Sequence, residues 1–281
     1  MSEPAPEAPV PPHPAATLIL LRDGPDGLEL LAMERHAGLR FAPGATVFPG
    51  GRLEAADHDP SWRDHWRRTH RPGAASPADL AHRVAALREC VEECGVLLSR
   101  DPLGDPLGDP LGDRLEAAAL AGLRAAMSAG EGFGPALARA GLVPALERMA
   151  PLARWVTPEG LPRRFDTLFF LAPAPSGQEP LCDGGEAVGA LWATPRRLLE
   201  EEKAGRRRLV FATRMTLLRL AGCADMASAM ACAKDGVLAG EALPPPILPR
   251  LVETAAGPVW RIPAACGFLP LETLAEHVRL G

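Results

Sequence analysis

Acidic side chains crowd one stretch of the sequence, residues 88–96, which reads Arg-Glu-Cys-Val-Glu-Glu-Cys-Gly-Val. On a helix, residues three and four apart share a face, so Glu89 lies beside both Glu92 and Glu93 and the like charges repel one another. A divalent cation such as Mg²⁺ or Mn²⁺ reverses that repulsion, because it takes oxygen ligands from several carboxylates. Taken alone, the stretch is also compatible with a solvated acidic face of a helix.

A Gly-Gly turn upstream adds a second candidate component of a site. Phe48 and Pro49 precede Gly50 and Gly51, and the acidic residue Glu54 follows them. Glycine has no side chain, so the backbone of such a turn can approach a ligand closely. The turn and the acidic stretch together favour a binding site over a solvated helix face.

The two stretches together resemble the Nudix box, in which Gly, five residues, Glu and seven residues precede Arg-Glu-apolar-any-Glu-Glu-any-Gly-apolar. The second half of the pattern is complete, and the residues that match it are Arg88, Glu89, Cys90, Glu92, Glu93, Gly95 and Val96. In the first half, the position five residues on from Gly51 is Asp57 instead of Glu, and 30 residues, 58 to 87, stand where the pattern has seven. An interrupted box of this kind is similar to that of one acyl-coenzyme A diphosphatase branch of the Nudix hydrolases.

The residues before the Gly-Gly turn resemble the coenzyme A signature of certain Nudix hydrolases. Four residues stand at the signature's positions, whereas three neighbouring positions depart from it: the matching residues are Arg35, Arg40, Gly44 and Phe48. A guanidinium group stays charged and pairs with two phosphate oxygens at once, which suits coenzyme A because it carries a 3′-phosphate besides its diphosphate. The resemblance therefore implies a substrate-binding set, namely Arg35, Arg40, Gly44, Phe48, Gly50 and Gly51.

The same resemblance implies roles for the acidic residues. Glu89, Glu92 and Glu93 are expected to bind Mg²⁺ or Mn²⁺, and Arg88 is expected to hold the glutamates in place. Nudix hydrolases can also take a carboxylate from a later loop as a metal ligand or base, and Glu186 occupies such a loop. The general base stays open among Glu92, Glu93 and Glu186.

The implied reaction is metal-dependent hydrolysis of the diphosphate of coenzyme A or acyl-CoA, which yields 3′,5′-ADP and (acyl-)4′-phosphopantetheine. One alternative is a Nudix pyrophosphatase that acts on NADH, ADP-ribose or another nucleoside diphosphate derivative. Another is a non-catalytic Nudix module that binds a nucleotide or a protein partner. Asp57 and the split box favour the non-catalytic alternative, whereas the complete set of carboxylates in the second half argues against it.

The resemblance and the hydrophobic patterns predict an α/β fold, a Nudix-type α/β/α sandwich with a mixed central sheet, helical insertions and a C-terminal extension. The apolar segments 17–22 and 28–33 flank a glycine-rich turn and are expected to open the sheet as a hairpin. The helix that carries the box is expected to run from about residue 76 to about residue 98, because Ser76 can cap it and Pro77 suits its first turn.

Domain organisation follows from the proline-rich and glycine-rich segments. Residues 1–14 are expected to be a disordered leader, and 15–281 one Nudix domain. Insertions are expected at about 58–75, with a short helix, and at about 100–150. The second contains three tandem Asp-Pro-Leu-Gly units, which are expected to form a surface turn, and two helices that could roof the pocket. A C-terminal extension is expected over about 205–281.

Composition sets limits on the class of partner. The net charge is −5 and the pI is about 5.8, which gives no electrostatic footprint for nucleic acid. No apolar run reaches the roughly 18 residues that a membrane span needs, so the cytoplasm is the expected location. The resemblance to the Nudix hydrolases implies a small-molecule diphosphate as the partner. Among the six cysteines, Cys90 and Cys94 are expected to pack in the core of the box helix. The oligomeric state is unknown.

Overall fold

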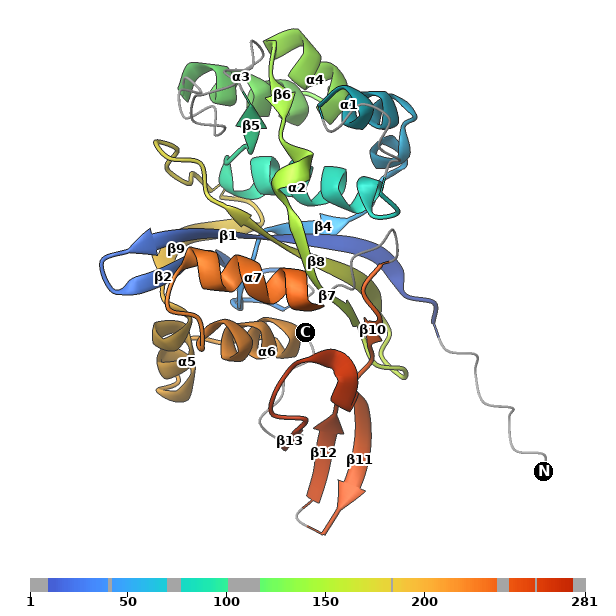
Figure 1. Ribbon diagram of the computed structural model, residues 1–281, viewed down its shortest axis with the longest axis vertical. Coiled ribbons are helices and arrows are strands. Elements are labelled where there is room, and N and C mark those ends of the chain that lie inside the picture. The colour runs from blue at the N-terminus through green and yellow to red at the C-terminus, as the bar shows by residue number, and fades with distance from the viewer. Residues whose placement is uncertain are drawn as a thin grey trace, which may run out of the picture.

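The apolar segments of the sequence form a mixed sheet with helices on both faces, as the computed structural model of the protein shows (Figure 1). The structure describes residues 10–39, 42–69, 77–100, 117–182, 184–236, 243–255 and 257–274. The strands of this sheet are β1 (His13–Gly24), β2 (Gly27–Arg35), β3 (Thr46–Val47), β4 (Gly50–Arg52), β7 (Ala150–Val156), β8 (Phe165–Pro173), β9 (Ala187–Ala193) and β10 (Pro246–Ile247).

The sheet is mixed because two of its strand pairs are parallel. Its main path runs β10-β7-β8-β1-β2-β3, while β4 pairs with β1 and β9 pairs with β2. The β1–β8 and β10–β7 pairs are parallel, and the other pairs are antiparallel. With helices on both faces, this arrangement confirms the predicted α/β fold.

The hairpin of β1 and β2 diverges and leaves a wedge that the Gly-Gly turn fills. The two strands pair from Leu21 opposite Leu30 down to the turn at Gly24 and Gly27. Further from the turn, β4 pairs with β1 and β3 pairs with β2. Because β8 and β9 occupy the outer edges of the hairpin, the segment 46–52 lies between its two strands. The fold therefore places the Gly-Gly turn inside the sheet.

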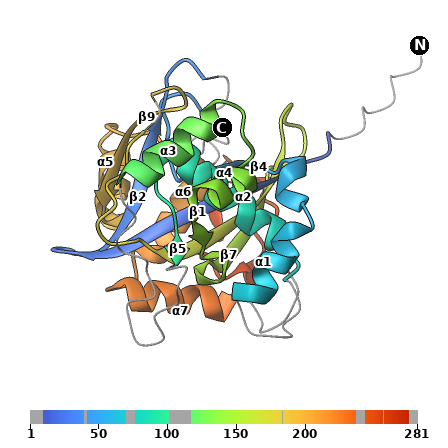
Figure 2. The same cartoon turned by 90° about the horizontal axis from the view of Figure 1, so that it is seen from above.

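Two layers of helices enclose the sheet. In Figure 1, α2 covers one face, with α1, α3 and α4 beyond it, and α5, α6 and α7 cover the other; Figure 2 shows the first layer from above. The helices are α1 (Ser61–Thr69), α2 (Leu80–Cys94), α3 (Ala117–Ser128), α4 (Phe133–Ala140), α5 (Pro195–Lys203), α6 (Phe211–Leu220) and α7 (Met226–Gly236). The alternating side chains of β1 serve both layers, since Leu18 and Leu20 pack with α2 while Ile19 and Leu21 pack with α6 and α7.

The helix α2 carries the acidic residues. It begins at Leu80, after Asp79, instead of near residue 76, and it also ends earlier than expected. Gly95 adopts a left-handed φ of 65° after Cys94 and donates its N–H to the carbonyl of Val91, which closes the last turn. The expected end near Leu98 is therefore wrong, and that residue is buried beyond the helix. Cys90 and Cys94 are fully buried free thiols, as expected for core residues.

The insertions pack against the outer side of α2. In α1, Trp62 and Trp66 are buried in the same core cluster as α2, which confirms the short helix expected there. Leu123 of α3 and Phe133 of α4 join that cluster as well. These two helices were expected to roof the pocket, but this prediction is wrong, because they pack on α2 on the side away from the sheet (Figure 1). The Asp-Pro-Leu-Gly units fall in residues 101–116, outside the described part of the chain.

The C-terminal extension contributes to the main domain and adds a small sheet. α6, α7 and β10 pack on or pair with the central sheet, whereas β11 (Arg250–Thr254), β12 (Gly257–Arg261) and β13 (Glu272–Leu274) form a separate three-stranded sheet. Short elements are η1 (Ala55–His58), β5 (Ser99–Arg100), β6 (Val143–Pro144), η2 (Leu146–Arg148) and η3 (Ala264–Cys266). At the other end, β1 already begins at His13, and residues 1–9 of the expected leader are not described. Among the described helices, none is long and apolar enough to cross a membrane.

Candidate active site

Glu89, Glu92 and Glu93 of α2 form a group of carboxylates that we call the acidic cluster, and Arg88 lies at its centre. Its side chain is buried, with 5% exposed, and its Nη1 donates to Glu89 Oε1 at 3.0 Å and to Glu92 Oε2 at 2.9 Å. Its Nη2 donates to the backbone carbonyl of Arg52 at 2.9 Å, which ties α2 to β4. Arg88 therefore orients two of the three glutamates, which is the role expected for it, and it also fixes the helix against the Gly-Gly turn.

Asp57 supplies the carboxylate that the first half of the box requires. Its two oxygens accept from Arg88 Nε and Nη2, both at 3.1 Å, and its side chain is 1% exposed. The backbone N–H of Glu54 also donates to Asp57, at 2.8 Å, which holds the carboxylate at the start of η1. The 30 residues between Asp57 and Arg88 leave and return through α1, so the interrupted box closes in space.

The Gly-Gly turn contacts the carboxyl groups of Glu93 and Glu89 directly. The N–H of Gly50 donates to Glu93 Oε2 at 2.8 Å, and Glu93 is buried, with 4% of the residue exposed. A Cβ added at Gly51 would overlap the carboxyl group of Glu89, whereas one added at Gly50 would overlap the backbone of Ala16 in β1. Both positions therefore need glycine, one for the acidic cluster and the other for the sheet.

Arg35 and Glu186 complete the cluster from the far ends of two paired strands. Arg35 ends β2 opposite Ala187 in β9, so the loop residue Glu186 lies next to it, and the carbonyl of Glu186 accepts from the N–H of His36 at 2.9 Å. The guanidinium nitrogens of Arg35 lie 3.9 Å from a Glu93 oxygen and 3.7 Å from a Glu186 oxygen. The Glu186 side chain is 60% exposed, which leaves it accessible from solvent.

Burial raises the pKa values of the three glutamates. Burial raises the pKa of Glu93 to about 8; the N–H of Gly50 opposes this shift and the charge of Glu89 adds to it. Burial also raises the pKa of Glu89 to about 7, against the attraction of Arg88, and raises the pKa of Glu92. The cluster thus holds more carboxylates than Arg88 and Arg35 neutralise, and a cation would stabilise their ionised forms.

The carboxylate oxygens of the cluster are suitable ligands for a divalent cation, but their positions in the structure do not surround a common point. Carboxylate oxygens are the ligands that Mg²⁺ and Mn²⁺ prefer. Within the described ranges, no three His, Cys, Asp or Glu side chains converge closely enough to hold an ion. Glu89 and Glu92 share the same nitrogen of Arg88, so both would have to turn toward Glu93 for the three to bind one ion.

The cluster borders a cleft of about 510 Å³. Arg35, Gly50, Gly51, Glu89 and Glu186 lie on its lining, and five aromatic residues on it come from distant parts of the chain: Phe48, Trp155, Phe165, Phe169 and Phe211. We call this space the aromatic cleft. The first turn of α6 also lines it, so the C-terminal extension forms part of its wall.

The structure brings most of the predicted site residues together. Of the signature residues, Phe48 is buried on the aromatic cleft, while Gly44, with a left-handed φ of 63°, lines a separate hollow on the other side of its loop. Arg40 lies outside the described residues. Sequence reasoning missed the other aromatic residues of the cleft, for which no local motif gives a signal: Trp155, Phe165, Phe169 and Phe211. The sequence analysis noted Asp57 as a departure from the Nudix box. The spacing of Asp57 from Gly51 was the signal for the role of this residue.

Comparison with known proteins agrees with this geometry. The NUDT19 Nudix domain family matches residues 66–210, which is about half of the 281 residues. The chain belongs to the NUDT19 Nudix domain family. The matched span contains the three glutamates and Glu186 but not the Gly-Gly turn, which the fold brings to them. The resemblance to the Nudix hydrolases is thereby confirmed.

Individual members and structures support the same family. The chicken (Gallus gallus) protein named acyl-coenzyme A diphosphatase NUDT19 is 29% identical over 222 residues, which cover 64% of this chain and 58% of the relative. The human (Homo sapiens) protein of that name is 30% identical over 208 residues, 62% of this chain and 56% of the relative. The chain thus spans just over half the length of these relatives. The crystal structure of a NUDIX hydrolase from Alicyclobacillus acidocaldarius has a TM-score of 0.61 and 35% identity, and the match covers 79% of this chain and 96% of the other.

The first prediction concerns the contact that closes the interrupted Nudix box. Asp57→Asn should lower the free energy of unfolding by about 3 kcal/mol, because it leaves the buried Arg88 guanidinium short of one charged partner. Asp57→Glu keeps the charge and should retain more of the stability than the asparagine variant does. Urea unfolding of the three proteins measures the difference. Equal stability of the Asn variant and the wild type would contradict the role given to Asp57.

The second prediction separates the two glycines of the turn. Gly51→Ala should weaken Mn²⁺ binding by about 10- to 100-fold with a nearly unchanged melting temperature, because the Glu89 carboxyl group can move away from the new methyl group. Gly50→Ala should lower the stability instead, by about 1–3 kcal/mol, because the backbone of β1 cannot move. Calorimetric titration with Mn²⁺ and thermal melting measure the two effects. The assignment is wrong if both variants behave alike.

Proposed function

We propose that this protein is a metal-dependent diphosphatase that hydrolyses coenzyme A or its acyl thioesters to 3′,5′-ADP and (acyl-)4′-phosphopantetheine. The observation that carries the proposal is the junction of the acidic cluster with the aromatic cleft, since Glu89, Glu186 and Arg35 line the same space as Phe48 and Phe211. A substrate that joins a diphosphate to large planar and apolar groups matches such a space. The names of the chicken and human relatives agree with this substrate class.

We assign the metal site to Glu89, Glu92 and Glu93. Bound Mg²⁺ or Mn²⁺ neutralises charge on the phosphoryl oxygens and lowers the pKa of an attacking water. The protein prepares its ligands in two ways: the N–H of Gly50 orients Glu93, and Arg88 holds Glu89 and Glu92 on one side of α2. These contacts keep the three carboxyl groups near one another, and Glu89 and Glu92 would turn toward Glu93 to bind an ion.

Arg35 is the residue that we assign to the diphosphate. Its two ion-pair distances of 3.9 and 3.7 Å exceed those of ordinary hydrogen bonds, and its Nε is buried with no acceptor in the described structure. A phosphate oxygen would supply that acceptor, and the guanidinium would offset negative charge beside Glu93 and Glu186. A role of Arg35 at the 3′-phosphate is less compatible with its position inside the acidic cluster. The corresponding role of Arg40 stays a prediction.

Three carboxylates remain candidates for the general base, and their restraints differ. Glu92 is bound to Arg88, Glu93 is buried against Gly50, and Glu186 is exposed on its loop beside Arg35. A base must reach the attacking water in the substrate complex, and each of the three borders or faces the cluster. Glutamine at each position in turn, with kcat followed against pH, distinguishes them.

The third prediction is metal dependence together with the need for Glu93. EDTA should abolish turnover, and Mg²⁺ or Mn²⁺ should restore it. Glu93→Gln keeps the shape of the side chain, removes its charge and should lower kcat on the order of 10² to 10⁴-fold. Glu272→Gln, which removes an acidic residue from the small C-terminal sheet, serves as the control and should leave kcat unchanged. Full activity in chelator, or a normal kcat for a folded Glu93→Gln protein, would move the chemistry to another site.

The fourth prediction concerns the substrate. With Mn²⁺ present, the wild-type protein should have a higher kcat/KM for coenzyme A or an acyl-CoA than for NADH or ADP-ribose, and 3′,5′-ADP should appear as the product. Chromatography of the nucleotide products measures both points. A preference for NADH or ADP-ribose would replace the proposed substrate, and no hydrolysis of any of the four would favour a non-catalytic module.

A further inference from the structure

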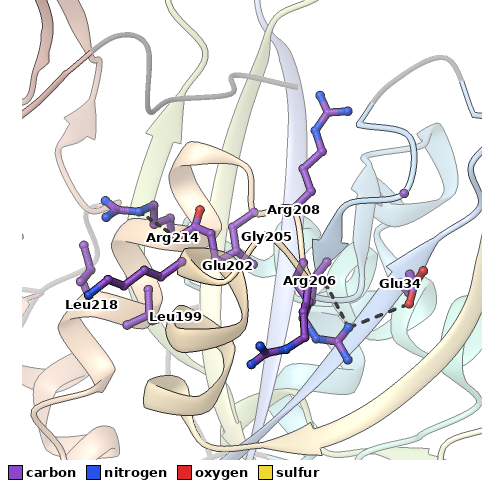
Figure 3. A pocket seen from close by; sticks show the side chains of 13 residues that line it. Glu34, Leu199, Glu202, Gly205, Arg206, Arg208, Arg214 and Leu218 are labelled. Carbon is purple, nitrogen blue, oxygen red and sulfur yellow. Dashed lines mark hydrogen bonds and ion pairs between the residues drawn. The ribbon is translucent and has the colours of Figure 1, made fainter.

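A second hollow lies on the other side of the loop that carries Gly44. It measures about 830 Å³, and its lining has five basic residues against two acidic ones. We call it the basic hollow, and its charged residues are Glu34, Glu202, Lys203, Arg206, Arg207, Arg208 and Arg214 (Figure 3). Its net positive charge contrasts with the acidic cluster, so the basic hollow suits a negatively charged group of a ligand.

The arginines of the basic hollow differ in how they are neutralised. Arg207 pairs with Glu201 and lies 3.9 Å from Glu34, and Arg214 donates to Glu202 at 3.0 Å. Arg208 has no ion pair in the described part of the chain. Its Nη1 reaches the carbonyl of Pro43 at 3.5 Å, the outer limit of a hydrogen bond, and its Nε is buried with no acceptor. Arg208 is therefore a half-buried cation that lacks an anion.

The position of Arg208 links the basic hollow to the active site. Its backbone carbonyl accepts from the N–H of Thr46 at 2.8 Å, and the N–H of Arg35 donates to the carbonyl of Ala45 at 2.9 Å. Arg35 and Arg208 thus flank one short loop, residues 42–46. The residues directly after Leu209 line the aromatic cleft. In Figure 3, Arg208 and Arg206 project in opposite directions, so Arg208 stands apart from the rest of the basic segment.

We propose that Arg208 is a substrate-specificity residue that binds a phosphomonoester group of the substrate, which in coenzyme A is the 3′-phosphate. This inference rests on the proposed function, because it places the diphosphate of the same molecule beside Arg35. A guanidinium with an unused Nε–H can offer two parallel donors to a phosphate, an arrangement that lysine cannot reproduce. The other cations of the basic hollow add a longer-range attraction for the same end of the substrate.

The test compares coenzyme A with dephospho-coenzyme A, which lacks the 3′-phosphate. Arg208→Gln should lower kcat/KM for coenzyme A by about 10- to 100-fold and leave the value for dephospho-coenzyme A nearly unchanged. Arg208→Lys should recover part of the loss. Arg196→Gln is the matched control, since it removes an exposed arginine of α5 that lines neither the aromatic cleft nor the basic hollow. Equal losses on both substrates, or no loss, would overturn the proposal.

A binding measurement keeps this inference separate from the proposed activity. In calorimetric titrations without metal, the wild-type protein should bind 3′,5′-ADP more tightly than 5′-AMP, and Arg208→Gln should remove the difference. The backbone bond between Arg208 and Thr46 is independent of the side chain, so the variant should keep its melting temperature. If the wild-type protein does not hydrolyse coenzyme A, the proposed function fails while the titration still decides the role of Arg208. Equal affinity of the wild type for the two nucleotides would refute that role.

Discussion

The buried guanidinium of Arg88 is the contact on which the rest of the site depends. It bonds to Asp57 before the interruption, to the Arg52 carbonyl beside the Gly-Gly turn, and to Glu89 and Glu92 on its own helix. Taking a cation out of water is costly unless most of its donors are satisfied, so these oxygens must be in place when the core forms. The geometry of the acidic cluster is thereby coupled to folding.

This coupling explains how the box tolerates a long interruption. The entropy needed to close a loop rises only with the logarithm of its length, about 0.6 kcal/mol per doubling. The inserted segment also contributes packing of its own, because Trp62 and Trp66 are buried against α2. Since both ends of the interruption meet at Arg88, the extra residues change the outer layer of the fold and leave the cluster intact.

Much of the fold and the residues of the acidic cluster followed from local patterns, whereas the aromatic wall of the cleft did not. The hairpin of β1 and β2 was expected from two apolar segments around a glycine-rich turn, and so was the buried pair Cys90 and Cys94 on the box helix. The end of α2 was missed because Gly95 takes a left-handed conformation that apolar periodicity does not register. Trp155, Phe165 and Phe211 line the cleft because strand order and a distant helix bring them together, and the sequence carries no local sign of such contacts.

The substitution of Asp57 for the glutamate of the pattern was the main support for a non-catalytic module. An aspartate side chain is one methylene shorter, so it reaches Arg88 only if its backbone lies closer. η1 provides that approach: the N–H of Glu54 binds Asp57 at 2.8 Å, and both carboxylate oxygens then reach Arg88 at 3.1 Å. The contact between this carboxylate and Arg88 is therefore formed, although the shorter side chain requires a closer backbone. The departure in residue type therefore carries little weight against catalysis, whereas the positions of Glu89, Glu186 and Arg35 on one cleft favour it.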